Sequence, residues 1–197
     1  MKNTIIASFL LLMSTTVFAQ GKYYLSYEIS DNELDGINVV SGASLDKDDT
    51  GYAILGGIHI NDNLDIELGY KDFGEASLSG VSGNQFTYRG TTYQFNATAT
   101  LSYEGDAYLI GLKPKYKIND NISLYGRLGV NMWDVTLNAA SGTASASADD
   151  DGHDFYYGVG IATSFAGLNI GLAHSIYEFD SDEVDSTALS LSYTLNF

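Results

Sequence analysis

Apolar and polar residues alternate with a period of two along most of this chain. In the stretch "SLSYTLNF" at 190–197, the odd-numbered residues are leucine, tyrosine and phenylalanine, and the even-numbered ones are serine, threonine and asparagine. This alternation predicts a β-strand with one apolar face. Eight segments follow it, and we predict strands over 22–30, 51–60, 64–73, 106–118, 122–135, 154–165, 168–179 and 187–197.

Short and long connections alternate between the predicted strands. The short ones carry turn residues, as tight hairpins require, and lie at 61–63 ("NDN"), 119–121 ("NDN") and 166–167 ("AG"). The long ones are polar and cover 31–50, 74–105, 136–152 and 180–186. All the short turns therefore lie at one end of the sheet, which predicts antiparallel strands in up-and-down order.

The two faces of these strands differ in a way that argues against a soluble barrel. One face is apolar on every strand, whereas the other carries nearly all the mid-strand charges together with many glycines. Such a face could not form the core of a soluble barrel such as a lipocalin. The charged inner positions are Glu28, His59, Asp65, Glu67, Lys71, Lys113, Lys115, Lys117 and Arg127.

With the apolar face outward and the charged face inward, the same pattern fits a protein embedded in a membrane. Strands of about 9–11 residues present an apolar wall to lipid around a polar interior. The sheet has to close, because an open edge inside a bilayer would leave backbone groups unpaired. The pattern therefore predicts an all-β protein, an eight-stranded antiparallel up-and-down transmembrane β-barrel of the bacterial outer membrane.

The first 19 residues form a separate segment. Lys2 precedes the apolar run "IIASFLLLM", and Val17 and Ala19 occupy the small-residue positions before Gln20. These features predict a cleaved signal peptide, whereas a retained membrane helix would need a longer apolar stretch. We predict a signal peptide over 1–19 and an outer-membrane β-barrel domain over 20–197, in a Gram-negative cell.

Composition narrows the possible partners. The chain has 25 acidic against nine basic residues, a net charge of −16, and no cysteine. Disulfides therefore cannot stabilise it after export. Phosphate groups would repel so acidic a chain, and no nucleic acid is expected as a partner. The expected partners are outer-membrane lipids and lipopolysaccharide.

Several stretches resemble the transmembrane domain of the OmpA family of outer membrane proteins. They are Gly56-Gly57, "ELGY" at 67–70, "KPKYKI" with its turn at 113–121, "YGRLG" at 125–129 followed by Trp133, "LAHSIYEFD" at 172–180 and "LSYTLNF" at 191–197. The resemblance covers essentially the whole chain after the signal peptide. Full-length members continue into a periplasmic peptidoglycan-binding domain. Here the chain is expected to end with the barrel, so no wall-tethering role is implied.

The resemblance implies an assembly signal in the last strand. In outer-membrane barrels, the barrel-assembly machinery recognises a final alternating strand that ends in an aromatic residue. By this likeness the signal consists of Tyr193, Leu195 and Phe197, and the assembly machinery is an expected partner. The last strand is also expected to pair with the first.

The resemblance also implies a charged cluster in the lumen. Glu67, Lys113 and Arg127 lie on three successive strands and match positions that form interior ion pairs in the family. An eight-stranded barrel is only wide enough for side chains to fill, so we expect a plug of ion pairs. The family's further partners are replaced here by Ala162, Gly171 and Ala173, which puts a partner-switching gate in doubt.

We expect neither catalysis nor a cofactor. His174 and Ser175 are adjacent, but neighbouring strand residues point to opposite faces and cannot share a proton. The pattern does not explain why His174 lies on the apolar face. His59 and His153 lie far from each other. A lipid A-modifying enzyme is the least favoured class.

No metal site is expected either. The stretch "DKDDTG" at 46–51 matches the start of an EF-hand loop, but its twelfth position is Gly57 instead of glutamate. The acidic runs at 148–154 and 180–185 have the composition of solvated surface. Diffuse bridging of divalent ions to lipopolysaccharide stays open as an alternative.

The second long connection suggests a surface function. Its alternating residues predict a hairpin that continues above the membrane, with a bulge near Gly105 where the apolar positions change parity. They are Tyr93, Phe95, Ala97, Ala99, Leu101 and Tyr103. We predict a membrane-integrity and surface-interaction role with a narrow, charge-plugged lumen. The alternative is an adhesin or phage receptor whose long loops bind host or phage ligands by strand addition.

Overall fold

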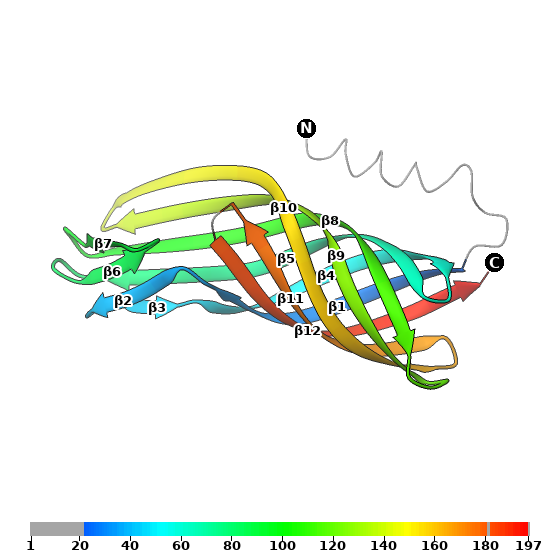
Figure 1. The fold of residues 1–197 in the computed structure, drawn as a ribbon. Coiled ribbons are helices and arrows are strands. Elements are labelled where there is room, and N and C mark those ends of the chain that lie inside the picture. Colours follow the sequence, from blue (N-terminus) through cyan, green and yellow to red (C-terminus); the bar gives the residue numbers. More distant parts are fainter. Residues whose placement is uncertain (1–21, 181, 197) are drawn as a thin grey trace.

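The computed structural model describes residues 22–180 and 182–196, so the predicted signal peptide and Phe197 lie outside the described residues. Eight long antiparallel strands form a sheet that closes on itself (Figure 1). They are β1 (Lys22–Leu34), β4 (Asp48–Asn61), β5 (Leu64–Gly80), β8 (Ala99–Lys117), β9 (Ile122–Ser141), β10 (Ala144–Phe165), β11 (Leu168–Phe179) and β12 (Asp182–Asn196). β12 pairs with β1, and the predicted eight-stranded barrel is confirmed.

The short turns lie at one end of the barrel. The turn between β10 and β11 consists of Ala166 and Gly167, whose φ angles of 51° and 83° are those of a type I′ hairpin. In the turn between β8 and β9, Asn119 Oδ1 accepts hydrogen bonds from the backbone amides of Asn121 and Ile122, each at 2.9 Å. The predicted turn residues therefore close the hairpins.

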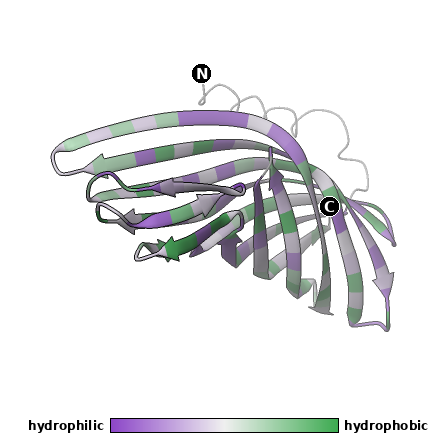
Figure 2. Cartoon of the chain, turned by 60° about the vertical axis from the view of Figure 1, so that its left-hand side comes forward, coloured by the Kyte–Doolittle hydropathy of each residue, from purple (hydrophilic) through white to green (hydrophobic). Residues whose placement is uncertain are grey.

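The long-loop end contains more strand than we predict from the sequence. β5, β8, β9 and β10 continue past the barrel and form a raised sheet on one side of it (Figure 2). β9 and β10 stay in register from Ile122↔Thr163 to Ser141↔Ala144, so the predicted loop over 136–152 is wrong. Residues 144–151 are exposed throughout, and their alternation of alanine with serine and aspartate contains none of the large apolar side chains that mark the barrel strands.

Four short strands complete the long-loop end. They are β2 (Ile37–Ser41), β3 (Ser44–Asp46), β6 (Gln85–Tyr88) and β7 (Thr91–Gln94). β3 extends the raised sheet by pairing with β5, and β2, β6 and β7 form a separate three-stranded sheet. Among the described residues, no helix is long and apolar enough to cross a membrane.

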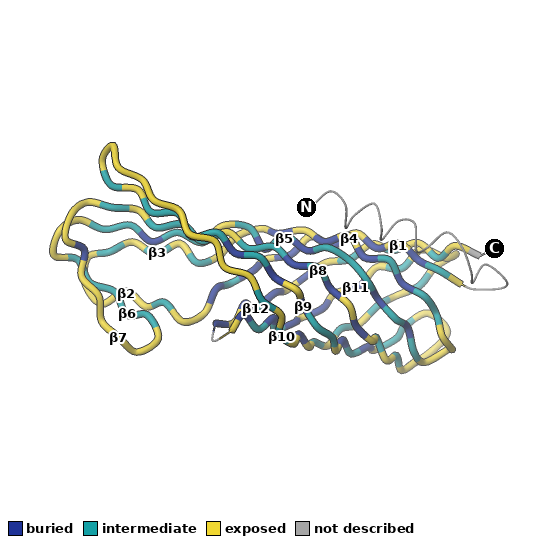
Figure 3. Tube along the Cα trace, turned by 90° about the horizontal axis from the view of Figure 1, so that it is seen from above, coloured by how far each residue is buried: buried dark blue, intermediate teal, exposed yellow. Residues whose placement is uncertain are grey.

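Burial along the barrel strands is the reverse of that in a soluble protein. Outward residues such as Leu128 (56% exposed) and Leu172 (52%) are apolar, whereas Glu28 (2%) and Lys71 (0%) are buried inside. Figure 3 shows buried and more exposed positions alternating along the barrel strands. The predicted assignment of the apolar face to lipid and the polar face to the lumen matches this pattern.

The bulge lies in β5 and not in β8. Asp72 pairs with Asp106 and Glu75 with Glu104, so that Phe73 and Gly74 together oppose Gly105. β8 keeps its parity through Gly105. Its apolar residues change from the outer to the inner face there, because above the bilayer the outer face meets water instead of lipid.

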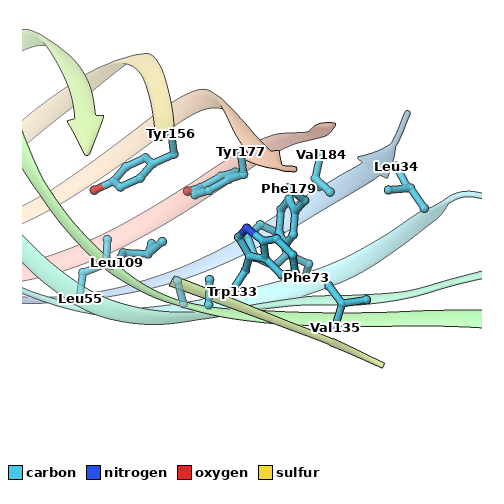
Figure 4. Packing of buried hydrophobic residues seen from close by; sticks show 12 residues of the cluster. Leu34, Leu55, Phe73, Leu109, Trp133, Val135, Tyr156, Tyr177, Phe179 and Val184 are labelled. Carbon is cyan, nitrogen blue, oxygen red and sulfur yellow. The ribbon is translucent and has the colours of Figure 1, made fainter. Parts of the chain in front are cut away.

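The inner face of this upper region forms an apolar core. Phe73 and Phe179 pack edge to face with ring centroids 5.1 Å apart, and Trp133 lies 5.7 Å from Phe179 (Figure 4). The buried members are Leu34, Ala53, Leu55, Phe73, Ala107, Leu109, Trp133, Val135, Tyr156, Tyr177, Phe179 and Val184. Most of this core lies toward the long-loop end of the lumen, and Leu55, Leu109 and Tyr156 extend it to the level of the charged residues.

Candidate functional site: a charged lumen beneath an apolar core

The three lumen residues singled out from the sequence contact one another. Lys113 Nζ lies 3.0 Å from Glu67 Oε1, and Arg127 Nε lies 3.2 Å from Glu67 Oε2. The side chains of Glu67 and Arg127 are each 3% exposed. One carboxylate therefore bridges two cations inside the barrel.

A fourth member, Glu28, was not singled out from the sequence. Its carboxylate accepts two hydrogen bonds from the Arg127 guanidinium, at 3.0 Å and 2.5 Å. Such bidentate pairs are the strong form of ion pair. The available signal was the inward parity of Glu28 on β1. The contact itself spans the lumen, because β1 and β9 are not neighbours in the sheet.

Aromatic side chains fill the space around these charges. The Tyr24 hydroxyl donates to Glu67 Oε1 at 2.6 Å. Lys113 Nζ lies 5.2 Å from the ring centroid of Tyr24 and 4.5 Å from that of Tyr125. A Cβ atom on Gly57 would overlap the Tyr24 ring, so glycine on the inner face makes room for the ring. Two carboxylates, two cations and their aromatic neighbours form a compact network.

A second polar cluster lies near the short-turn end. Asp65 Oδ1 lies 2.5 Å from Lys115 Nζ and 2.6 Å from His59 Nδ1. Asp65 is almost fully buried, while the side chains of Lys115 and His59 are 17% and 23% exposed. The lumen is thus most open to solvent at this end.

Lys71 lies between the charged network and the apolar core. It is fully buried, donates to Ser30 Oγ at 2.8 Å, and lies 5.1 Å and 5.3 Å from the ring centroids of Phe73 and Tyr177. No ion pair is found for Lys71 within residues 22–180 and 182–196. Both rings belong to the apolar core, so Lys71 contacts this core directly.

A contact between distant loops holds the upper region together. Arg89 Nη2 lies 3.0 Å from Asp182 Oδ2, Arg89 Nε donates to Asp182 Oδ1 at 3.2 Å, and the Tyr88 hydroxyl donates to Asp182 Oδ2 at 2.7 Å. We call these three residues the latch. Burial, followed by the bond to Asp182, raises the pKa of Tyr88 to about 12. The latch joins the turn between β6 and β7 to the start of β12.

The candidate catalytic residues do not converge. His174 faces outward and lies 3.4 Å from Asp185, whereas Ser175 is buried inside the barrel. The cross-strand partner Thr187, whose hydroxyl lies 3.2 Å from His174 Nδ1, and the diagonal neighbour Asp185 give His174 a polar environment on the outer surface. In the part of the chain that the structure describes, no group of three acidic, histidine or cysteine side chains is arranged to hold a metal ion.

Two of the three assembly-signal residues lie on the outer surface of β12. Tyr193 (55% exposed) pairs with Leu25, and Leu195 (39%) pairs with Tyr23 across the closing seam of the barrel. The third residue, Phe197, is outside the described residues.

Comparisons with known proteins agree with this architecture. A family model described as the OmpA-like transmembrane domain matches residues 20–167. Ail, the attachment invasion locus protein of Yersinia pestis, solved with the heparin analogue sucrose octasulfate, is similar with a TM-score of 0.58 at 15% identity, over 90% of this chain and 100% of Ail. The N-terminal β-barrel domain of Pseudomonas aeruginosa OprF has a TM-score of 0.48 at 12% identity, over 86% of this chain and 97% of that domain. A search of curated proteins finds no match. This chain belongs to the OmpA-like transmembrane domain family and is an outer membrane β-barrel.

Proposed function

We propose that this protein has a structural and surface-interaction role in the outer membrane and that its lumen is plugged. The observation that supports the plug is Arg127, almost fully buried between Glu28 and Glu67. A charge so placed is expensive to separate from its partners. The apolar core around Trp133 adds a second obstruction toward the long-loop end.

Conductance in planar bilayers tests the plug. Wild-type protein is expected to show small, rare openings, and Glu67→Ala more frequent ones, because Lys113 and Arg127 both lose a partner. Glu104→Ala removes a carboxylate from the raised sheet and serves as the matched control, with wild-type conductance. A large, steady conductance in the wild type would rule out the plugged lumen.

The structural role has its own test. A strain that lacks the protein is expected to be more sensitive to detergent than its parent, and the plugged Glu104→Ala variant should restore resistance. Unchanged detergent sensitivity would contradict a role in membrane integrity.

A surface adhesin or phage receptor is the second candidate, supported by the raised sheet. β10 pairs with β11 only from Tyr156 onward, so residues 144–155 pair with β9 alone and leave one strand edge open. An open edge can accept an extended segment of another protein by strand addition. Replacing residues 137–148 by an Asn-Gly turn should abolish attachment of host cells or phage to this protein while the barrel stays folded. Attachment that survives this change would contradict binding at the edge.

The net charge of the long-loop end determines which kind of ligand it can bind. Glu28, Asp62, Asp65, Glu67 and Asp120 lie in the lumen or at the short-turn end, and the remaining twenty of the 25 acidic residues lie toward the long-loop end. The basic residues there are Lys47 and Arg89. An anionic ligand such as the one bound to Ail would be repelled, and a basic partner is favoured.

We further propose that the protein is not an enzyme and that residues 1–19 direct its export. The separation of His174 from Ser175 supports the first point. Absence of acyl transfer and hydrolysis on purified lipopolysaccharide would agree with it, whereas turnover abolished by Ser175→Ala would contradict it. N-terminal sequencing of the mature protein tests the second, with Gln20 as the expected first residue.

A further inference from the structure

A small cavity opens where β4 separates from β5. Its volume is about 20 Å³, enough for one water molecule or one metal ion. Asn32, Asp49 and Glu75 line it together with Phe73 and Tyr103. A wider cleft of about 550 Å³ adjoins it, because Asp49 and Glu75 line both. Asp72, Glu104, Asp106, Asp134 and Asp149 provide the remaining carboxylates of the cleft.

One polar atom at the cavity lacks a partner. Asn32 is 3% exposed, its amide nitrogen donates to the Phe73 carbonyl at 3.0 Å, and its Oδ1 atom is buried with no hydrogen bond. A buried amide oxygen without a partner costs about 1–3 kcal/mol. Since Asn32 and Phe73 both line the cavity, an occupant of the cavity is positioned to satisfy this oxygen.

The Asp49 carboxylate at the cavity is held by the bulge in β5. Asp49 Oδ2 accepts the backbone amide of Glu75 at 2.7 Å, and Asp49 Oδ1 accepts that of Thr50 at 2.7 Å. Above Tyr52↔Asp72 the strands β4 and β5 no longer pair, and the hydrogen bond from the Glu75 amide to the Asp49 side chain connects them there. The bulge thus brings Asp49 to Glu75.

Like charges meet across the neighbouring strand pair. Glu75 pairs with Glu104 and Asp72 with Asp106, and carboxylates directly opposite each other destabilise a sheet. Lys47 also lines the cavity, but its ammonium group is paired with Glu33. The negative charge around the cavity therefore exceeds the positive charge.

We propose that this cavity binds a divalent cation, Ca²⁺ in preference, through Asn32 Oδ1 and the carboxylates of Asp49 and Glu75, with water at the remaining positions. Ca²⁺ accepts carboxylate, amide and water oxygens in irregular geometry, whereas Mg²⁺ demands a near-ideal octahedron. The site has two carboxylates, which agrees with the absence of any three-residue metal cluster in the described ranges. The bound ion ties β1, β4 and β5 together at the base of the raised sheet.

The sequence argument against an EF-hand at 46–57 does not apply to this site. That argument asked for ligands within one loop, whereas the proposed ligands come from three strands and only Asp49 belongs to the acidic run. The site is independent of the lumen plug and of strand addition.

The test compares two glutamates that face each other across β5 and β8. Tb³⁺ is bound to the full barrel in detergent, its luminescence is excited through Tyr103 at the cavity, and Ca²⁺ is titrated to displace it. Glu75→Gln is expected to weaken Ca²⁺ binding about tenfold, because it removes a charged ligand. Glu104, the register partner of Glu75, lies in the open cleft. Glu104→Gln should therefore change the affinity for Ca²⁺ by no more than about twofold, as expected for altered screening alone.

Three results would overturn the proposal. They are displacement by KCl at matched ionic strength, equal losses in Glu75→Gln and Glu104→Gln, and a wild-type titration that does not saturate. Asn32→Ala should also weaken binding and is checked for a heat-modifiable, folded barrel. Because Glu75 is exposed, its variant keeps the comparison decisive even if Asn32→Ala fails to fold.

Discussion

Adjacent residues of one strand occupy opposite environments in this barrel. In β9, Arg127 is 5% exposed and contacts Glu28 and Glu67, whereas Leu128 is 56% exposed on the outer surface. Each residue is stable only in its own environment, because an unpaired charge is costly in lipid and an apolar residue cannot satisfy the charges of the lumen. Substitutions at neighbouring positions therefore fail for different reasons.

Depth decides the cost of a charge on the outer face. Leu128→Arg places a guanidinium against the hydrocarbon and is expected to reduce the free energy of unfolding by about 2–4 kcal/mol. Met132→Arg, four residues farther along the same face and beside Tyr108, should cost about 0–1 kcal/mol near the interface. Urea titration in lipid vesicles measures both. Equal losses would show that the two positions do not differ in depth.

Removing Glu28 tests the lumen network at its most buried pair. Glu28→Ala leaves Arg127 with Glu67 as its remaining carboxylate, which Lys113 shares, and should cost about 3–5 kcal/mol. The double variant Glu28→Ala with Arg127→Met removes both charges and leaves Glu67 paired with Lys113, so it should recover most of the loss. Urea unfolding of the three proteins gives the comparison. A double variant as unstable as Glu28→Ala would contradict charge imbalance as the cause.

The sequence identifies which residues enter the lumen but not every contact that they make there. Alternation places Glu67, Lys113 and Arg127 inside, and adjacent strands bring them together. Glu28 has the same parity, yet its partner lies on a strand across the lumen. Side-chain length and strand tilt decide which inward residues meet, and neither is visible in the hydropathy pattern.

At the scale of elements, hydropathy predicts a strand only where its two faces meet different environments. The barrel strands satisfy this condition, and their predicted positions are confirmed. The upper part of β10, residues 144–151, is exposed throughout and contains only small and acidic residues, so neither of its faces resembles the apolar face of a barrel strand. Its backbone pairing with β9 is the property that a sequence of small and acidic residues does not reveal.

The latch joins two loop elements through Tyr88, Arg89 and Asp182. Cleavage by trypsin can detect when these two elements separate. Asp182→Asn removes the nearer of the two carboxylates paired with Arg89, the other being Asp180 at 3.6 Å, and this partly exposed pair is worth about 1 kcal/mol. Cleavage after Arg89 should then be roughly fivefold faster, since 1.4 kcal/mol corresponds to a factor of ten. Cleavage after Lys47 serves as the internal control and should not change. Equal acceleration at both sites would indicate general loosening of the loops.

The latch also predicts a response to alkaline pH. The pKa of Tyr88 is raised from 10.0 to about 12 by burial and by its bond to Asp182, so the folded state holds this proton more tightly than the unfolded state. The latch contribution is therefore complete below pH 10 and is lost as pH rises through 12. The difference in tyrosinate absorbance between wild type and Tyr88→Phe should titrate near pH 12. A midpoint at pH 10 would mean that the hydroxyl is not bonded.

At the scale of the molecule, the closure of the barrel and its one-sided extension at the long-loop end have different origins. Closure follows from eight alternating strands, and the sequence predicts it because backbone groups in a bilayer must all be paired. The asymmetry comes from four strands that extend past the others into water, where no membrane restricts their length. The charge distribution follows the same division, with the acidic excess at the raised end and a balanced network in the lumen.

We propose that assembly of the whole barrel depends on its last strand. β12 pairs with β1 along its length, and the resemblance to outer-membrane barrels assigns the terminal aromatic residue to recognition by the assembly machinery. Phe197→Ser should therefore lower the amount of heat-modifiable protein in the outer membrane several-fold, with precursor degraded in the periplasm.

Phe165→Ser provides the matched control for Phe197→Ser. Phe165 is an outward aromatic residue, 81% exposed, at the short-turn end of the barrel and internal in the sequence. Phe165→Ser removes an aromatic side chain at the membrane interface, where such rings anchor a barrel, and Phe197→Ser is expected to remove an anchor of the same kind. Only Phe197→Ser alters the terminal strand signal, so only it should reduce the yield in cells, while both purified chains should refold equally in detergent. Equal yields in cells would mean that Phe197 acts as an interfacial anchor and not as an assembly signal.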